Sequence, residues 1–266
     1  IWAEFGKNIS FTNEEVNLAT CDIVFLSLDV PTNENNESHL EPIESALKKI
    51  EGVLPSDTPL IILSQVPPGF VRQHSQHHLN LFYQVETLIF GNAVNRAKFP
   101  ERFILGTKNL EDELPKSVQH FYQAFNNAPV FRMKYESAEL AKISINCFLS
   151  STITTTNVLA TACEKIGADW HEIIPILQTD KRIGKHAYLK PGLGISGGNL
   201  MRDLKTVLKM SEAQNFQAEP VETWIQHSNH MRNWCLQKLS EIACYKKSNL
   251  KLSILGLSYK ENTSST

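Results

Sequence analysis

The side chains with the clearest chemical potential are Lys142 and Asn146, which lie in a mainly apolar segment. A spacing of four residues places both side chains on one face of a helix, one turn apart. An ammonium group beside a carboxamide can hold a substrate hydroxyl and stabilise the alkoxide that develops as a hydride leaves. The same pair can also be an ordinary solvated helix face, but the apolar character of residues 143–148 leaves little solvated surface around it.

A second candidate is a run of glycines that we call the glycine loop, residues 191–198. Four glycines fall within seven residues of it: Gly192, Gly194, Gly197 and Gly198. Glycine permits positive φ and lets backbone N–H groups approach a ligand closely. The loop lies between a basic stretch, residues 181–190, and a helix that we expect to begin near Asp203. Such a loop suits a phosphate or pyrophosphate, and the alternative is a flexible surface linker.

A third candidate is the segment Ser64-Gln-Val-Pro-Pro-Gly69, which follows an apolar run typical of a buried strand. Ligands of open α/β sheets bind beyond the carboxyl ends of the strands. The segment is therefore either part of a ligand site or only a turn that ends the strand.

The elements that must position these residues begin with an alternation of strands and helices. Short apolar runs predict buried strands at residues 21–28, 59–64 and 103–106. Helical periodicity predicts helices at residues 39–53, after the Pro-Pro-Gly turn to about residue 81, and at 118–126. This alternation predicts an α/β fold with a doubly wound parallel sheet.

From Tyr135 the pattern becomes helical. Residues 137–166 contain neither proline nor glycine, with Ser137 as the expected N-cap and Glu139 in the expected acidic first turn. A helix of that length spans roughly 45 Å and often forms the spine of a dimer. Further helices are expected at residues 170–177, 204–214 and 221–246, followed by a strand at 250–257.

The bulk properties narrow the class of protein. The chain has 266 residues, is 42% hydrophobic and carries a formal charge of −2, which gives no footprint for nucleic acid or an anionic membrane surface. Its five cysteines have no metal-ligand spacing and predict buried free thiols in a reducing compartment. No run is long and apolar enough for a membrane span, so we expect a cytoplasmic protein without a metal site. The abrupt start and the unpaired final strand predict a fragment of a longer chain.

In their order, these segments resemble the nucleotide-sugar dehydrogenases of the UDP-glucose 6-dehydrogenase type. Residues 191–203 resemble the family's active-site loop, P-G-x-G-x-G-G-S-C-F-P-K-D, and residues 138–169 resemble its central helix. The other similar segments are residues 25–32, 64–69, 83–91, 99–106, 180–184 and 254–260.

The resemblance implies a partial Rossmann-like NAD-binding domain at residues 1–130, without its first G-x-G-x-x-G unit. It further implies a helical domain for dimerisation and the active site at 131–248, and the start of a UDP-binding domain at 249–266. The implied NAD contacts are Val30, Pro31, Thr32, Ser64, Gln65 and Glu86. The implied contacts with a UDP-sugar are Arg182, Lys190, Gly194, Gly197 and Lys260. The implied catalytic residues are Lys142, Asn146, Asp203 and Glu86, in a homodimer.

Several positions depart from the family pattern. Asn199 occupies the slot of the nucleophilic cysteine, and Phe90 that of a glutamate that handles water. The other changed slots are Gln65, Val85 and Arg202. The resemblance implies two hydride transfers, the second through a thiohemiacetal, and an asparagine cannot form one. Two hypotheses follow: an oxidoreductase limited to a single hydride transfer, or a catalytically silent dimeric homologue that binds NAD or a nucleotide sugar. Cys147 points about 100° away from Asn146 around a helix and is not expected to replace the missing thiol.

Overall fold

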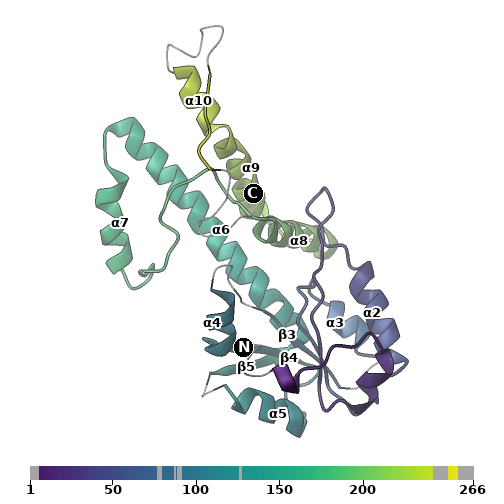
Figure 1. The fold of residues 1–266 in the computed structure, drawn as a ribbon. Helices are drawn as coiled ribbons and strands as arrows, with labels where there is room; N and C mark the ends of the chain where they lie inside the picture. The colour runs from purple at the N-terminus through teal and green to yellow at the C-terminus, as the bar shows by residue number, and fades with distance from the viewer. Residues whose placement is uncertain are drawn as a thin grey trace. The chain divides into compact units, whose positions relative to one another are not determined.

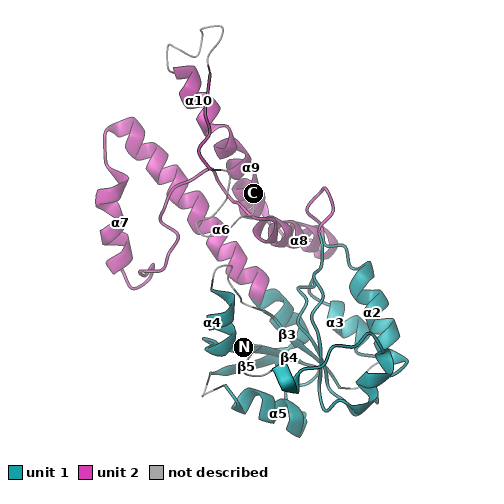
Figure 2. Ribbon diagram, viewed as in Figure 1, with its two compact units in different colours: residues 1–31, 38–141 teal, residues 32–37, 142–266 magenta. Residues whose placement is uncertain are grey.

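The computed structural model describes residues 6–76, 80–86, 88, 92–125, 128–241 and 251–256. It divides into two compact units (Figure 2). Unit 1 comprises Ile1–Pro31 and Ser38–Ala141, and unit 2 comprises Thr32–Glu37 and Lys142–Thr266. We describe each unit by itself.

Unit 1 is built on a five-stranded sheet whose strands lie in sequence order, and Figure 1 labels three of them, β3, β4 and β5. The strands are β1 (Val24–Leu26), β2 (Leu60–Ile62), β3 (Leu81–Gln84), β4 (Phe103–Thr107) and β5 (Val130–Lys134). Three of the pairings are parallel, and β3 pairs with β4 in antiparallel orientation. The expected parallel α/β sheet is therefore confirmed with one correction, because the sheet is mixed.

Short helices precede and connect the strands of this sheet. They are η1 (Gly6–Asn8), η2 (Glu15–Thr20), α2 (Glu41–Glu51), α3 (Phe70–His74), α4 (Ala93–Lys98) and α5 (Lys116–Gln123). Side chains alternate between the two faces of a strand, so Leu60 and Ile62 of β2 pack in one core cluster and Ile61 in the other. The first cluster includes α2 and the second α5. This sandwich of helix, sheet and helix is the expected Rossmann-like arrangement.

In unit 1 the sequence-based prediction is wrong at one helix end and lacks one strand. The helix expected to continue to about residue 81 ends at His74, and Leu81 begins β3. Strand β5 was not predicted at all. Its exposed-to-intermediate burial and its alternation with Arg132 and Lys134 are typical of an edge strand rather than a buried one.

The second part of the chain is helical. The 32-residue helix α6 (Tyr135–Ile166) begins in unit 1 and continues through unit 2 (Figures 1 and 2). It is followed by α7 (Trp170–Thr179), α8 (Gly198–Gln214), α9 (Glu219–Arg232) and α10 (Trp234–Glu241). The long central helix and the helical section after it are confirmed.

Three helix boundaries and one expected strand in this section differ from expectation. Helix α6 begins at Tyr135, so Ser137 is not its N-cap. Helix α8 begins at Gly198 rather than near Asp203, because Gly197 has φ 85° and ψ 135° and the next residue can enter the helix. The single helix expected at 221–246 is two helices separated at Asn233. The expected strand at 250–257 is not formed by residues 251–256, and its two ends lie outside the described residues.

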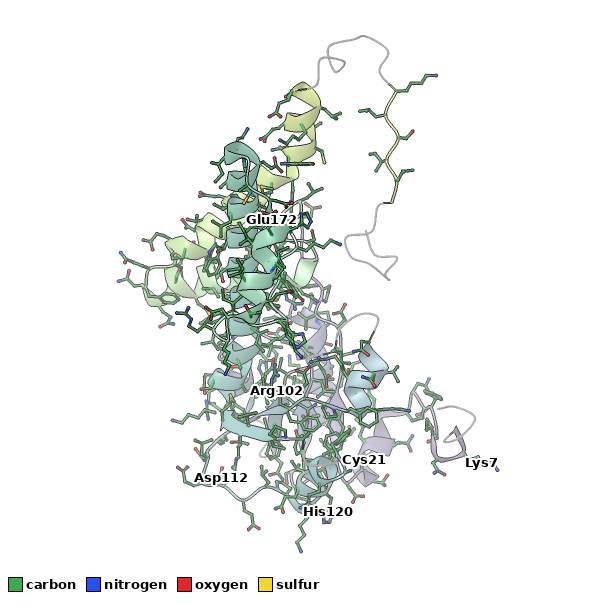
Figure 3. All side chains as sticks on the ribbon, turned by 90° about the vertical axis from the view of Figure 1, so that its left-hand side faces the viewer. Lys7, Cys21, Arg102, Asp112, His120 and Glu172 are labelled. Carbon is green, nitrogen blue, oxygen red and sulfur yellow. The ribbon has the colours of Figure 1, made fainter. Side chains whose placement is uncertain are left out.

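The described cysteines are free, as expected, but only Cys163 is buried. Cys21, labelled in Figure 3, and Cys147 are half-buried, and Cys235 is exposed. Cys244 lies outside the described residues. The predicted burial of the thiols is therefore wrong for three of the four.

Candidate active site

The centre of the candidate site is a buried hydrogen bond between α6 and α8. Asn146 Nδ2 donates to Asp203 Oδ2 at 2.5 Å. The two residues are only 4% and 1% exposed, although they are 57 positions apart in sequence. A buried carboxylate needs hydrogen-bond partners, and Asn146 is one partner of Asp203. The structure therefore brings together two of the predicted catalytic residues.

A third member of the cluster, Arg202, was seen in the sequence only as a departure from the family's lysine. Arg202 is 5% exposed, and its Nε lies 3.5 Å from Asp203 Oδ1. Both oxygens of the Asp203 carboxylate therefore have nitrogen partners. The sequence signal that could have identified Arg202 is a charged residue next to Asp203 at the start of an amphipathic helix.

Lys142 lies on α6 one turn before Asn146, on the same helix face, as the spacing predicted. Its side chain is half-buried and makes an interaction within the protein. The alternative of a plain solvated helix face is not supported for the pair, because Asn146 is buried.

Asn199 is the second residue of α8, and its side chain is exposed. Cys147 is the cysteine considered as a replacement for the missing nucleophile. It packs against the cluster of Ile195, Leu204 and Val221. Burial raises the pKa of the Cys147 thiol to about 11, and the charge of Asp203 acts in the same direction. Since the thiolate is the nucleophilic form, Cys147 is not an activated nucleophile at neutral pH. This agrees with the expectation from the helix geometry.

The glycine loop is anchored to two helices of unit 2. Asn157 Oδ1 on α6 accepts a hydrogen bond from Gly192 N at 2.8 Å, and Ser228 Oγ on α9 accepts one from Ile195 N at 2.9 Å. Neither anchoring side chain was identified from the sequence. A flexible surface linker would lack such hydrogen bonds. The two bonds therefore fix the glycine loop against α6 and α9.

Gly194, a predicted substrate contact, has a structural reason to be glycine. Its φ is +93°, and a Cβ atom would lie 2.7 Å from Ser228 Oγ and 2.8 Å from the Ser228 carbonyl oxygen. We expect Gly194→Ala to destabilise the protein by about 2–4 kcal/mol, from backbone strain and overpacking together. Urea unfolding measures the change.

Gly192→Ala is the matched control for that variant. No atom lies within 4 Å of a Cβ at Gly192, and its N–H bond to Asn157 survives the substitution. We expect a change within about 0.5 kcal/mol. Equal effects of the two substitutions would contradict the described packing of the loop on Ser228.

The predicted substrate contacts outside the glycine loop lie on the surface. The Arg182 side chain is 89% exposed, and its guanidinium makes two bonds to Asp180, Nε to Oδ1 at 3.0 Å and a terminal nitrogen to Oδ2 at 2.6 Å. Lys190 is exposed, and it has an interaction within the protein. Lys260, like Phe90, lies outside the described residues. Roles for these residues in substrate binding stay predictions.

Two of the predicted NAD contacts in unit 1 have side chains that are already engaged in contacts within the protein. The Ser64 hydroxyl donates to Leu28 O at 2.6 Å and accepts from Leu28 N at 3.1 Å, joining the chain segments that follow β1 and β2. Val30 is 4% exposed and belongs to the core. Contacts of Ser64 and Val30 with a cofactor would therefore use backbone atoms.

The other predicted NAD contacts are more open. Pro31 and Thr32 are exposed, and Gln65 and Glu86 are half-buried. Glu86 accepts a hydrogen bond from Gln84 Nε2 at 3.1 Å. Beyond β2, Gly69 has φ +95° with open space where a Cβ would be. Ligands of open α/β sheets bind beyond the carboxyl ends of the strands, and a cofactor contact of these residues stays a prediction.

Comparisons with known proteins assign these two parts of the chain. Residues 3–126 match the NAD-binding domain of the UDP-glucose/GDP-mannose dehydrogenase family, and residues 136–230 match the central domain of the same family. The chain therefore belongs to the UDP-glucose/GDP-mannose dehydrogenase family, with NAD as the cofactor of its first domain.

Individual relatives agree with the family assignment. UDP-glucose 6-dehydrogenase of Rickettsia bellii is 28% identical over 263 residues, covering 97% of this chain and 60% of the relative. UDP-glucose 6-dehydrogenase TuaD of Bacillus subtilis is 26% identical, covering 97% of this chain and 57% of the relative. The chain thus spans about 60% of the length of these relatives.

A solved structure supports the fold. The structure of a UDP-glucose dehydrogenase from the archaeon Pyrobaculum islandicum matches with a TM-score of 0.79 at 23% identity, over 90% of this chain and 57% of that one. Among the described residues, no helix has the length and apolar character that a membrane span requires.

Proposed function

We propose that this protein is an NAD-dependent oxidoreductase that removes one hydride from a CH–OH group of a nucleotide sugar, with a UDP-glucose-like substrate. NAD supplies the hydride acceptor when it is bound. The observation that carries the proposal is the buried Asn146–Asp203 hydrogen bond, with Lys142 one helical turn away.

Each residue of the cluster has a role that follows from its chemistry. Lys142 and Asn146 hold the substrate hydroxyl oxygen and stabilise the negative charge that develops on it. Asp203 fixes the orientation of the Asn146 carboxamide, and Arg202 in turn fixes Asp203. A preorganised group of this kind stabilises charge without reorganising during the reaction.

The second oxidation is assigned as lost. A thiohemiacetal requires a nucleophilic thiolate, and Asn199 cannot supply one. Cys147, next to Asn146 in sequence, has a raised pKa, which supports the view that it does not replace the missing nucleophilic thiol. The product of the single transfer is then the aldehyde.

A catalytically silent homologue is the second candidate. The exposed Asn199 at the start of α8 and the Arg202 in place of lysine favour it, since both changes lie in the active-site loop. Such a protein would bind NAD or a nucleotide sugar and act through its dimer.

NADH formation separates the two candidates. The protein is mixed with NAD and UDP-glucose, and NADH absorbance is followed alongside NAD binding by calorimetry. NADH formation supports the oxidoreductase. NAD binding without NADH would contradict it and favour the silent homologue.

We also propose that the protein is a homodimer. Phe148, Leu159 and Ile166 are 77%, 44% and 78% exposed and are separated by 11 and 7 residues along α6, which places them on one helix face. An exposed apolar stripe on a long helix supports packing against a second copy. Sedimentation velocity should give a dimer that Phe148→Glu weakens, and a monomeric wild type would contradict this assignment.

A further inference from the structure

Glu139 is a fully buried carboxyl group that joins two segments of unit 1 far apart in sequence. It is 0% exposed and lies on α6. Its Oε2 accepts a hydrogen bond from Gly69 N at 2.6 Å, and its Oε1 accepts one from Val71 N at 2.8 Å. The sequence predicted an acidic residue serving the first turn of its own helix. Instead, Glu139 serves the beginning of α3.

The turn that Glu139 holds, residues 67–71, lies at the carboxyl end of β2. Gly69 is in the left-handed region, and Phe70 N donates to Pro67 O at 3.1 Å. The first N–H groups of a helix have no partner within it, so Gly69 and Val71 need an external acceptor. Glu139 is that acceptor, and its two oxygens fix two points of the turn.

Burying a carboxylate at this position costs desolvation free energy. Burial raises the pKa of Glu139 to about 7, although the N–H groups of Val71 and Gly69 act to lower it. The charged groups that act on it are Glu136 on α6, which raises the pKa, and Arg72 on α3, which lowers it. Arg72 is itself bonded to Glu136 at 2.8 Å. A neutral residue would avoid the desolvation but would offer only one acceptor oxygen.

We propose that Glu139 is a positioning residue for the dinucleotide site: it holds the turn at residues 67–71 in the conformation that receives the cofactor. The inference rests on the proposed NAD-dependent function and deepens it. Lys142 follows three residues later on the same helix, so the segment that fixes the turn also carries a residue of the candidate active site.

The arrangement has a consequence for pH. Protonation turns one acceptor oxygen of Glu139 into a hydroxyl and weakens its hold on the turn. NAD affinity should therefore decrease as the pH falls through about 7. Folding stability should change in the opposite direction. A carboxyl group with a raised folded-state pKa contributes stability that is present below its unfolded pKa and is lost as the pH rises through about 7.

The opposite signs distinguish positioning from a general structural role. If Glu139 only supported the fold, its titration would change stability and leave the NAD affinity of the folded protein independent of pH. In the proposed arrangement, acid favours the folded state while it loosens the turn.

The test compares the wild type with Glu139→Gln and with Glu136→Gln as the matched control. Glu136 lies on the same turn of α6 and contacts Arg72, but not the turn at 67–71. NAD affinity is measured by calorimetry from about pH 6 to about pH 8.5, a range that spans the titration. We expect Glu139→Gln to weaken NAD binding about tenfold at the alkaline end and to abolish its pH dependence, since hydrogen bonds to a charged group are among the strong ones. Glu136→Gln should keep the wild-type affinity at the alkaline end and keep a pH dependence. Its transition should lie at lower pH, because the charge of Glu136 helps to raise the pKa of Glu139.

Unchanged NAD affinity and pH profile in Glu139→Gln would overturn the inference while leaving the proposed function intact. Absence of NAD binding by the wild type would overturn both. Should Glu139→Gln fail to fold, Glu139→Asp and the wild-type pH profile give the same decision, since a pH-independent wild-type affinity contradicts the positioning role.

Discussion

Replacement of Lys142 by Met is expected to lower kcat for NADH formation by about 10²–10⁴-fold, the usual contribution of a positioned side chain that manages protons or charge at the reacting atom. Lys142 is half-buried one helical turn before Asn146 on α6, and methionine keeps most of its apolar stem. The thermal stability should change little, and KM for the sugar should change less than kcat. Steady-state kinetics with UDP-glucose and NAD measure the effect.

Lys165→Met is the matched control. Lys165 lies in the last turn of the same helix and is exposed. Its kcat should stay within about twofold of the wild type, because an exposed position far along the helix touches no reacting atom. A loss of less than about tenfold in Lys142→Met would remove Lys142 from the reaction we assign to it.

Replacement of Asp203 by Ala is expected to cost about 3–5 kcal/mol of unfolding free energy, because it leaves the buried guanidinium of Arg202 without this carboxylate. The Asp203 and Arg202 side chains are 2% and 6% exposed. The Asn146 carboxamide would lose its partner in the same variant, so NADH formation should also fall. Chemical denaturation and steady-state kinetics measure the two effects.

Two control variants make the Asp203→Ala result interpretable. Glu15→Ala removes an exposed ion pair with Lys49, whose atoms lie 3.7 Å apart, and should change stability by less than about 1 kcal/mol. Asp203→Asn keeps the shape of the side chain without its charge, and should be more stable than Asp203→Ala. If Asp203→Ala is as stable as Glu15→Ala, the buried cluster does not exist in solution.

Much of the fold could be predicted from the sequence, because its strongest local signals are also its structural elements. Strand β2 is a continuous apolar run, and α6 contains neither proline nor glycine. Strand β3 was missed because a short apolar run cannot be distinguished from the end of a helix by periodicity. Strand β5 was missed because its side chains are exposed or half-buried and include Arg132 and Lys134, so it shows no continuous apolar run.

The candidate site was predictable only where its residues lie close together in sequence. The spacing of Lys142 and Asn146 identified a helix face, and the structure confirms the helix. Contacts between residues far apart in sequence could not be predicted. Asp203 bonds Asn146 across 57 positions, and Glu139 bonds Val71 across 68. Ser64 shows a structural role that its motif did not predict. Its motif predicted a cofactor contact, while its hydroxyl is engaged by Leu28.

The departures from the family pattern fall on one half of the expected chemistry. Lys142, Asn146 and Asp203 are the residues that we propose for the first hydride transfer, and two of them form a buried hydrogen bond. Asn199 and Phe90 stand where the resemblance places the groups of the second. We therefore propose an enzyme that stops at the aldehyde, in preference to one that has lost all of its site.

The ratio of NADH formed to UDP-glucose consumed tests this account most directly, with the carbonyl product identified by mass spectrometry after trapping with a hydrazine. The wild type should form one NADH per sugar and release the aldehyde. Asn199→Cys, run in parallel, reports whether a thiol at that position can start the second oxidation. Two NADH per sugar and a sugar acid from the wild type would contradict the account, because the protein would then complete the four-electron oxidation without a cysteine at position 199.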